Sequence, residues 1–257
     1  MSRHQIFPVA LLCAASLVAC GKDAVREITG PVPGARIKFF NFSVNAPGVN
    51  FYANDRKMTA ISSATGQESV LGTGYGEPGA GGFYTALPPG QYELSGRIAA
   101  ATDKDLKIAT QTATLSDGKN YSFYQSGFYD AATKTADTFL IEDKLPTQLD
   151  YSYAYVRFVD AISNANPMIL FAKSTTSAGE FVLSGAVGYK SAGEFVSLPS
   201  GFYDLSTRYP GASGKAIARA GVSFVGGTIY TVTARGDITV TSTTATNRPF
   251  LDATANR

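Results

Sequence analysis

Apolar and polar residues alternate with a period of two along most of this chain, and no segment has the spacing of a long amphipathic helix. In the segment 35–41, Ile37 and Phe39 alternate with Arg36 and Lys38. Successive side chains of a β-strand point to opposite faces of the sheet, so the apolar pair is predicted to face a core and the polar pair to face water. Short alternating segments separated by turns rich in glycine and proline predict an all-β protein.

The alternating pattern occurs twice. The stretch Ala35–Asp55 returns as Ala154–Ser174, where Val156 and Phe158 are predicted to face inward and Arg157 outward. Later landmarks repeat in the same order, and each is a turn followed by a strand. They are Leu87, Pro88, Gly90 and Tyr92 against Leu198, Pro199, Gly201 and Tyr203, then Gly118 and Tyr121 against Gly227 and Tyr230. An ordered repeat of this kind indicates an internal duplication, and hence two copies of one module.

The duplication sets the predicted domain boundaries. Module one covers 34–146 and module two covers 152–246, with a short connector at Lys144–Asp150. Residues 247–257 are predicted to form a loose polar tail, because chain ends are often poorly ordered. Each module is long enough to bury a core of its own. The predicted fold is two tandem antiparallel immunoglobulin-like β-sandwiches of about seven strands each, arising from the internal duplication.

The amino terminus has a different pattern. Arg3 and His4 give it a short basic start, and an apolar run then extends from Ile6 to Ala19. That run is shorter than the roughly 20 residues of a membrane-spanning helix, and it has the form of a secretory signal. Residues 1–19 are therefore predicted to be a signal peptide that is removed.

The end of the apolar run reads Leu-Val-Ala-Cys, which resembles the lipobox of bacterial lipoproteins, with the lipid on Cys20. The alternative is an ordinary signal peptide followed by a chance cysteine. Residues 20–33 are predicted to be the lipidated cysteine and a tether, and Gly21, in place of aspartate, resembles a signal for the outer membrane. Each buried methylene of a lipid contributes about 0.8 kcal/mol. The motif thus predicts the membrane as a partner and a lipid-anchored location in the bacterial cell envelope, facing the periplasm or the cell surface.

Removal of the signal narrows the possible chemistry. It takes away His4, the one histidine of the chain, and Cys13, one of its two cysteines. A Ser-His-Asp or Cys-His catalytic arrangement, a zinc site of histidine and cysteine, and a disulfide then lack the residues they need. The loss of Arg3 lowers the 22 basic residues by one, against 20 acidic residues, so the charge does not predict a nucleic-acid partner. We expect a protein without catalytic residues, metal or cofactor.

The most unusual loop is Gly72–Gly82, which reads GTGYGEPGAGG. A phosphate-binding loop needs a helix after it and a Gly-Lys-Ser/Thr ending, and neither follows, so no nucleotide is predicted. We expect a mobile hairpin or a loop between sheets, with ligand contact by Tyr75 as the alternative. The counterpart in module two, Gly185–Gly193, is shorter and poorer in glycine.

A second candidate site is the aromatic-rich segment Tyr121–Tyr129. Its rings are expected to face a core or a module interface, or alternatively to form an exposed platform for sugar rings or a protein. Tyr124 and Tyr129 are the candidate contacts. Carboxylates for glycoside hydrolysis are also present, but nothing in their spacing pairs them. They are Glu77, Glu93, Asp130, Glu142, Asp143, Glu180 and Glu194.

The opening stretch resembles a known bacterial family. Residues Ala35–Ser43, Asn45–Pro47 and Val49–Tyr52 follow the opening pattern of the family catalogued as domain of unknown function 4397, with Val44 where proline is usual. The Leu-Pro-x-Gly-x-Tyr turn also matches in both modules. The resemblance implies an extracytoplasmic, often lipid-anchored protein with tandem immunoglobulin-like sandwiches. It brings no catalytic residues, because its motifs are structural.

These features together predict a non-enzymatic, membrane-anchored envelope lipoprotein that acts in binding or adhesion to a protein or a glycan. The alternatives are a glycan-binding or carbohydrate-active protein, and a purely structural envelope component. Since the repeated residues are requirements of the fold, function is expected where the two copies differ. The main differences are Gly72–Gly82 and Gly127–Ile141.

Overall fold

A computed structural model describes residues 33–59 and 70–256 of the chain. The predicted signal peptide, Cys20 and almost all of the predicted tether lie outside the described residues. The chain from Pro33 to Arg257 forms one compact unit. Within the described ranges no α-helix occurs, and so none that is long and apolar enough to cross a membrane.

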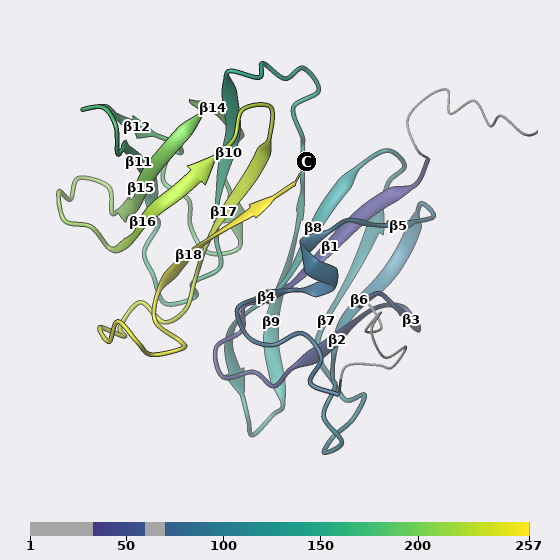
Figure 1. Ribbon diagram of the computed structural model, residues 1–257. Helices are drawn as coiled ribbons and strands as arrows, with labels where there is room; N and C mark the ends of the chain where they lie inside the picture. Colours follow the sequence, from purple (N-terminus) through teal and green to yellow (C-terminus); the bar gives the residue numbers. More distant parts are fainter. Residues whose placement is uncertain (1–32, 60–69, 257) are drawn as a thin grey trace, which may run out of the picture. The chain divides into compact units, whose positions relative to one another are not determined.

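Module one is built from β1 to β9, which form two sheets (Figure 1). One sheet has the order β4-β1-β8-β9, with β5 also paired to β1, and the other has the order β3-β2-β6-β7. A 3-10 turn, η2 (Gly79–Gly82), follows β4. The strands are β1 (Ala35–Asn41), β2 (Val49–Ala53), β3 (Arg56–Lys57), β4 (Glu77–Pro78), β5 (Thr85–Leu87), β6 (Gly90–Ile98), β7 (Lys107–Leu115), β8 (Asn120–Asp130) and β9 (Thr135–Glu142).

Module two repeats this plan with β10 to β18. One sheet has the order β13-β10-β17-β18, with β14 also paired to β10, and the other has the order β12-β11-β15-β16. The strands are β10 (Tyr153–Asp160), β11 (Ile169–Ser174), β12 (Glu180–Val182), β13 (Ser191–Ala192), β14 (Val196–Pro199), β15 (Gly201–Arg208), β16 (Ile217–Phe224), β17 (Ile229–Arg235) and β18 (Phe250–Ala255).

The two modules correspond strand for strand, from β1 with β10 to β9 with β18. The registers correspond as well, since Lys38 lies opposite Ser122 in module one and Arg157 lies opposite Thr231 in module two. The prediction of two tandem immunoglobulin-like β-sandwiches from a duplication is thus confirmed. Each copy has nine strands in the described residues rather than about seven. The additional pairings are as short as β3, which is too short to show an alternating pattern.

The pairing of the first strand differs from the prediction. We expected every pair to be antiparallel, but β1 pairs with β8 in parallel, and β10 pairs with β17 in parallel. A tight hairpin forces two strands to be antiparallel, whereas a parallel pair needs a long connection. Six strands of the module separate β1 from β8, so no hairpin constrains their direction.

The predicted loose tail is also wrong for most of its length. Strand β18 pairs with β17 from Phe250 to Ala255, and Leu251 is fully buried. This strand is the counterpart of β9 and completes the sheet of module two. The boundary predicted after residue 246 relied on the position near the chain end, whereas order depends on the burial and hydrogen bonding of the backbone.

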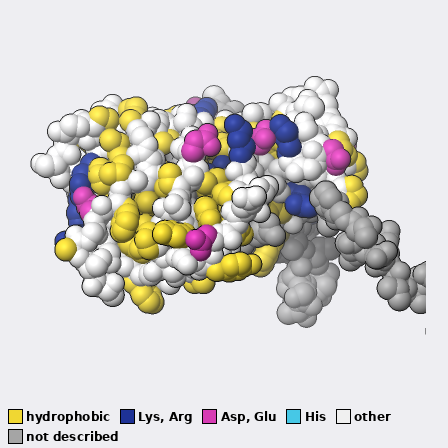
Figure 2. Space-filling model, turned by 90° about the horizontal axis from the view of Figure 1, so that it is seen from above, with side chains coloured by type: hydrophobic (Ala, Val, Ile, Leu, Met, Phe, Trp, Pro, Cys, Tyr) yellow, Lys and Arg dark blue, Asp and Glu magenta, His cyan; other side chains and the backbone are white. Residues whose placement is uncertain are grey.

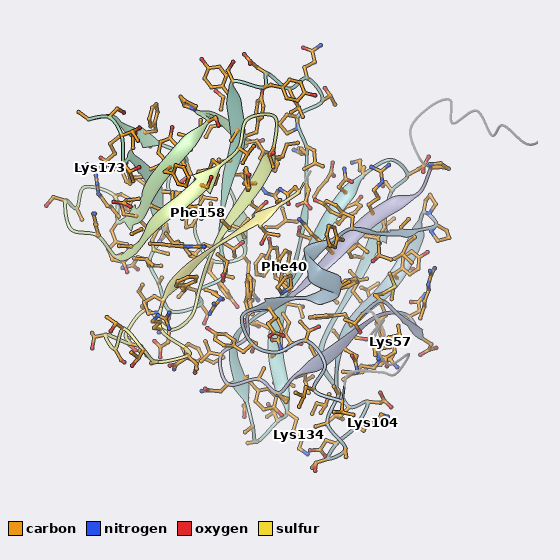
Figure 3. The ribbon with its side chains drawn as sticks, in the orientation of Figure 1. Phe40, Lys57, Lys104, Lys134, Phe158 and Lys173 are labelled. Carbon is orange, nitrogen blue, oxygen red and sulfur yellow. The ribbon has the colours of Figure 1, made fainter. Side chains whose placement is uncertain are left out.

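Each module has a core of its own between its two sheets. In module one the ring of Phe39 stacks on that of Phe51 at a centroid distance of 5.2 Å, and Phe123 meets Phe39 edge-on at 5.9 Å. In module two Phe158 is fully buried in the equivalent core. Figure 3 labels Phe158 in module two and Phe40 in module one. Phe40 belongs to neither core, because its side chain lies on the opposite face of β1 from Phe39.

Candidate functional site

A third hydrophobic cluster joins the two modules, and we call it the junction. Its members are Phe40, Phe42, Tyr124 and Phe139 of module one with Val159 and Ala161 of module two. Tyr124 lies between two parallel rings, 4.7 Å from the centroid of Phe40 and 4.6 Å from that of Phe139. Module one supplies large rings and module two supplies small side chains, so the two faces are complementary in volume.

Two buried cations flank the junction. The alternation in β1 and β10 predicted that Lys38 and Arg157 face water, but they are only 1% and 2% exposed. They do point away from the core of their own module, as predicted. The prediction of solvent exposure is wrong because each of these outer faces is covered by the other module, which the pattern within one strand does not reveal.

Arg157 of module two is paired with Asp143 of module one, and both side chains are almost fully buried. The Arg157 Nε also donates to Thr231 Oγ1 at 3.0 Å. The second carboxylate oxygen of Asp143 accepts from the hydroxyls of Tyr84 at 2.6 Å and Ser122 at 2.7 Å. A buried ion pair of this kind is tolerated because the remaining polar atoms are also hydrogen-bonded.

Lys38 of module one reaches in the opposite direction, to the end of module two. Its Nζ donates to Asn256 Oδ1, lies 3.5 Å from the carbonyl oxygen of Ala255 and lies 4.6 Å from the centroid of the Tyr84 ring. Burial lowers the pKa of Lys38 to about 8, Asp143 partly opposes this shift, and the nearby Arg157 adds to it.

These contacts are related by an approximate two-fold exchange of the modules. Lys38 and Arg157 hold the same position in β1 and β10. Their partners also correspond, because Asp143 directly follows β9 and Asn256 directly follows β18. The backbone N–H of Asp143 donates to Asn120 at 2.7 Å, and that of Asn256 donates to the equivalent Ile229 at 2.7 Å. Each cation therefore contacts the end of the last strand of the other module, as in a two-fold symmetric dimer interface.

The aromatic neighbours of the two cations follow the same exchange. Lys38 lies over Tyr84, and the guanidinium of Arg157 lies 4.8 Å from the centroid of Phe195. Tyr84 precedes β5 and Phe195 precedes β14, which pair with β1 and β10 respectively. A cation over an aromatic face is attracted by the ring quadrupole. Each of the two buried cations is therefore stabilised by a ring at the equivalent position of its own module.

The glycine-rich segment lies in the connection between the sheet of β3 and the sheet of β4, as expected for an inter-sheet loop, and it forms another part of the contact between modules. Its residues 77–78 pair with β1, and the ring of Tyr75 lies 5.1 Å from the guanidinium of Arg235 on β17. In module two the equivalent Tyr189 donates to Asp137 Oδ2 at 3.0 Å and shares a 2.9 Å hydrogen bond with Ser126 Oγ. Both segments therefore contact the other module.

The three predicted contact tyrosines do not gather in one groove. Tyr75 is half-buried beneath Arg235, and burial raises its pKa. Tyr124 is fully buried in the junction, so its predicted role as an exposed contact is wrong, and burial raises its pKa to about 12. Tyr129 packs against the core of module one. The expectation that the segment Tyr121–Tyr129 forms core and interface is the one that fits.

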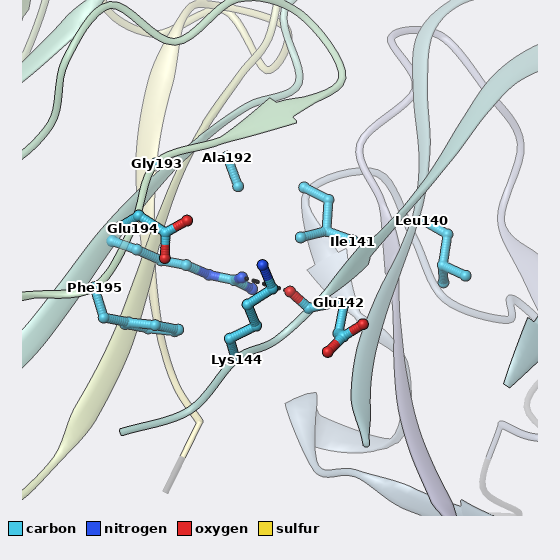
Figure 4. Close-up of a pocket in the computed structure, with 9 residues that line it drawn as sticks. Leu140, Ile141, Glu142, Lys144, Ala192, Gly193, Glu194 and Phe195 are labelled. Carbon is cyan, nitrogen blue, oxygen red and sulfur yellow. Dashed lines mark hydrogen bonds between the residues drawn. The ribbon is translucent and has the colours of Figure 1, made fainter. Parts of the chain in front are cut away.

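An open cleft lies at the edge of the junction, with a volume of about 300 Å³. Figure 4 shows residues of β9 and the connector on one wall and residues around β13 and β14 on the other. The Arg157 side chain also lines it. The remaining lining residues are Leu140, Ile141, Glu142, Lys144, Ala192, Gly193, Glu194 and Phe195.

The charges in this cleft differ in how they are paired. Glu142 forms an ion pair with Lys119 at 2.9 Å, and Arg157 is paired with Asp143. Glu194 and Lys144 are exposed, and neither forms an ion pair with another described residue. The cleft thus offers one carboxylate and one ammonium group, next to the ring of Phe195, to a polar ligand.

The described part of the chain contains no group of three or more acidic, histidine or cysteine residues that could hold a metal ion. On the face shown in Figure 2, basic and acidic side chains lie next to one another rather than in separate patches. This distribution offers no single-sign surface on that face for a strongly charged partner.

Sequence reasoning did not identify the charged residues of the junction. Lys38 and Arg157 were assigned to the solvent face. Asp143 was considered only as one of several carboxylates for glycoside hydrolysis, and Asn256 was not considered. A signal was present, because a basic residue recurs at the same position in both copies of the opening strand. The other repeated residues are requirements of the fold. A long basic side chain that recurs at one position of both copies therefore indicates a contact that both copies make.

The chain matches a known family. A family model described as "Domain of unknown function (DUF4397)" matches residues 35–171, which is more than half of the chain. The match begins with β1 and ends within β11, so it includes all of module one and the opening strands of module two. No curated protein matches the chain.

Proposed function

Because the chain belongs to the family described as Domain of unknown function (DUF4397), whose name assigns no activity, we propose its function from its own residues. It is a non-enzymatic binding protein of the bacterial cell envelope, anchored through Cys20, that takes a polar ligand into the cleft at the edge of the junction. A lipid anchor holds the protein at the membrane, and residues 21–33 separate the modules from the lipid surface.

The observation that carries this proposal is a pair of charges in the cleft, one basic and one acidic, that form no ion pair with another described residue. Most charged groups of the junction are already committed, as Arg157 is to Asp143 and Glu142 is to Lys119. Lys144 and Glu194 line the same cleft without an ion-pair partner among the described residues. A ligand with both a cationic and an anionic or hydroxyl group, such as a peptide or an amino sugar, would complement them.

The buried junction holds the two modules together rather than leaving them loosely tethered, and this favours a binding function. The stacked rings of Phe40, Tyr124 and Phe139 and the Arg157–Asp143 pair fix the walls of the cleft to each other. A cleft whose walls are already positioned loses less conformational entropy when a ligand binds. Adhesion to a protein or a glycan is the natural use of such a site on an anchored protein.

A carbohydrate-active role is the second candidate, and one observation favours it. Glu142 and Glu194 line the same cleft, and glycosidases use two carboxylates on either side of the scissile bond. The ion pair of Glu142 with Lys119 occupies one of these groups, which favours binding of a sugar over its hydrolysis.

Glycan and peptide arrays probed with residues 33–257 test the binding proposal. A ligand should be captured by the unsubstituted protein and lost with Glu194→Gln and with Lys144→Gln. Lys173→Gln, a change on the exposed face of β11 in module two, is the matched control and should keep binding. Binding that survives both cleft variants, or arrays without signal, would reject the cleft as the site. Release of reducing sugar that stops with Glu194→Gln would instead establish the second candidate.

The anchor has its own test. Mass spectrometry of the protein purified from bacterial membranes should find an amino-terminal Cys20 that carries lipid, and Cys20→Ser should release the protein from the membrane fraction. A mature protein with an unmodified amino terminus would remove the anchor from the proposal and leave the binding site untouched.

A further inference from the structure

The two modules differ clearly in the connection between their last two strands. In module one β8 and β9 are joined by the short turn 131–134, whereas in module two β17 and β18 are joined by residues 236–249. The longer loop is held at its base by Asp237, which accepts from Asn164 Nδ2 at 2.8 Å and from the backbone of Thr239 at 3.0 Å. Module two therefore has an ordered wall for which module one has no counterpart.

This loop and the edge strand β16 enclose a groove of about 510 Å³. Such a volume lies within the usual range for small-molecule sites, roughly 300–1,000 Å³. Apolar side chains and the hydroxyls of the loop form its lining, together with one arginine, Arg248. The lining residues are Ala216, Ile217, Ala218, Ile238, Val240, Thr241, Ser242, Thr243, Arg248, Pro249 and Phe250.

The arginine in the groove has no acidic partner among the described residues. Arg248 Nη1 donates to the carbonyl oxygen of Ala245 at 3.0 Å, and its guanidinium lies 5.4 Å from the centroid of Phe250. By contrast Arg235, which also lies over the Phe250 ring at 5.2 Å, is paired with Asp252. A guanidinium has five N–H donors, so Arg248 keeps donors that an anion in the groove would accept.

We propose that module two binds an apolar molecule with one anionic group in this groove. The apolar part lies against Ile238, Val240 and Phe250, and the anionic group, a carboxylate or a sulfonate, meets Arg248. The site is distinct from the cleft at the junction, which has charges of both signs and is lined by other residues. It depends on the loop that distinguishes the second copy from the first.

The test uses residues 33–257, which form one compact unit, and two fluorescent probes that differ in charge. The anionic probe is 8-anilinonaphthalene-1-sulfonate, and the neutral probe is N-phenyl-1-naphthylamine. The anionic probe should bind once per chain. Arg248→Gln should weaken it about tenfold or more, as expected for the loss of a hydrogen bond between charged groups, and should leave the affinity for the neutral probe nearly unchanged. Val240→Asp should weaken both probes.

Three controls keep the outcome decisive. Ser242→Trp fills the groove from its hydroxyl side and replaces Val240→Asp if that variant does not fold. Lys134→Gln changes a cation in the short turn of module one and should leave both affinities unchanged, as should Lys144→Gln in the junction cleft. The proposal is overturned if the anionic probe does not bind, if Arg248→Gln and the groove-filling variant leave its affinity unchanged, or if Lys144→Gln abolishes binding.

Discussion

Lys38 and Arg157 hold the same position in two copies of one strand, and each buries its cation against the end of the other module. This relationship gives the junction an approximately symmetric frame. The hydrophobic side chains that pack in the junction are not symmetric, because Phe40 of module one corresponds to the smaller Val159 of module two. A symmetric frame with complementary volumes favours the pairing of unlike modules over the pairing of like ones.

Removal of Arg157 is expected to be among the most damaging changes in the junction. Arg157→Ala leaves Asp143 buried and without its cation, which typically costs about 3–5 kcal/mol. The measurement is the free energy of unfolding by chemical denaturation of residues 33–257. Lys107→Gln, which breaks the exposed pair with Glu93, is the control and should cost less than about 1 kcal/mol. Equal effects of the two variants would show that the buried pair has no special weight.

The buried Asp160 makes stability depend on pH. Burial raises the pKa of its carboxyl to about 7, and the hydrogen bond from the backbone N–H of Ile162 partly opposes this shift. The folded protein therefore holds this proton more tightly than the unfolded chain does. Below the ordinary pKa of aspartate, near 3.8, Asp160 is protonated in both states and its ionisation does not lower the free energy of unfolding. As the pH rises from there to about 7, the ionisation of Asp160 in the unfolded chain lowers the free energy of unfolding.

Asp160→Asn should accordingly raise the free energy of unfolding at pH 8 by roughly 2–4 kcal/mol and have little effect at pH 4. The equivalent residue of module one is Asn41, so the fold accepts an amide at this position. Denaturation of both proteins across this pH range measures the difference. A constant difference at all pH values would mean that Asp160 does not titrate in this window.

Lys38 makes the protein more stable as the pH rises above about 8, whereas Asp160 makes it less stable as the pH rises to about 7. Because burial lowers its pKa to about 8 from 10.5, the unfolded chain holds the proton more tightly, and the contribution of Lys38 to stability rises between these two pH values. Relative to Lys38→Met, the unsubstituted protein should gain up to about 3 kcal/mol over this range. Comparison of the two proteins cancels the titration of other groups. No relative gain would indicate that the Lys38 ammonium remains solvated.

The contact of the glycine-rich segment with module two is tested at one glycine. Gly76 has φ +83°, and a Cβ there would lie 2.9 Å from the guanidinium carbon of Arg235. Gly118 has φ +70° with nothing within 4 Å of a Cβ, so Gly118→Ala measures the backbone strain alone, about 1–2 kcal/mol. Gly76→Ala should cost more than this control in thermal or chemical denaturation. If the two costs are equal, Arg235 moves aside freely and the segment is not fixed to module two.

The sequence allowed the fold to be predicted because the duplication repeats local requirements. Alternation placed Ile37, Phe39, Val156 and Phe158 in the cores, and the repeated turns showed that both copies share one topology. The direction of the β1–β8 pair was not predictable in this way, because it depends on contacts between segments far apart in the chain. Strand β18 was missed because its pairing with β17 crosses the long loop 236–249.

The junction was harder to predict than either core. Alternation gives the face of a sheet to which a side chain points, but not what covers that face. Lys38 and Arg157 were predicted to be exposed to solvent for this reason. Tyr124 was predicted to be a candidate contact, because a ring on the outer face of a sheet fits either an interface or an exposed platform. The proposed groove likewise requires two elements, β16 and the loop 236–249, that are adjacent only in the folded chain.

The central claim is that the junction holds the two modules as one unit, and a distance measurement between them tests it most directly. Residues 33–257 contain no cysteine, so spin labels can be attached to Thr112→Cys on β7 and Lys173→Cys on β11, both exposed positions within strands. Double electron–electron resonance should give one narrow distance distribution, which broadens when Phe40→Ala and Arg157→Ala are added. A broad distribution in the protein without junction substitutions would contradict the claim.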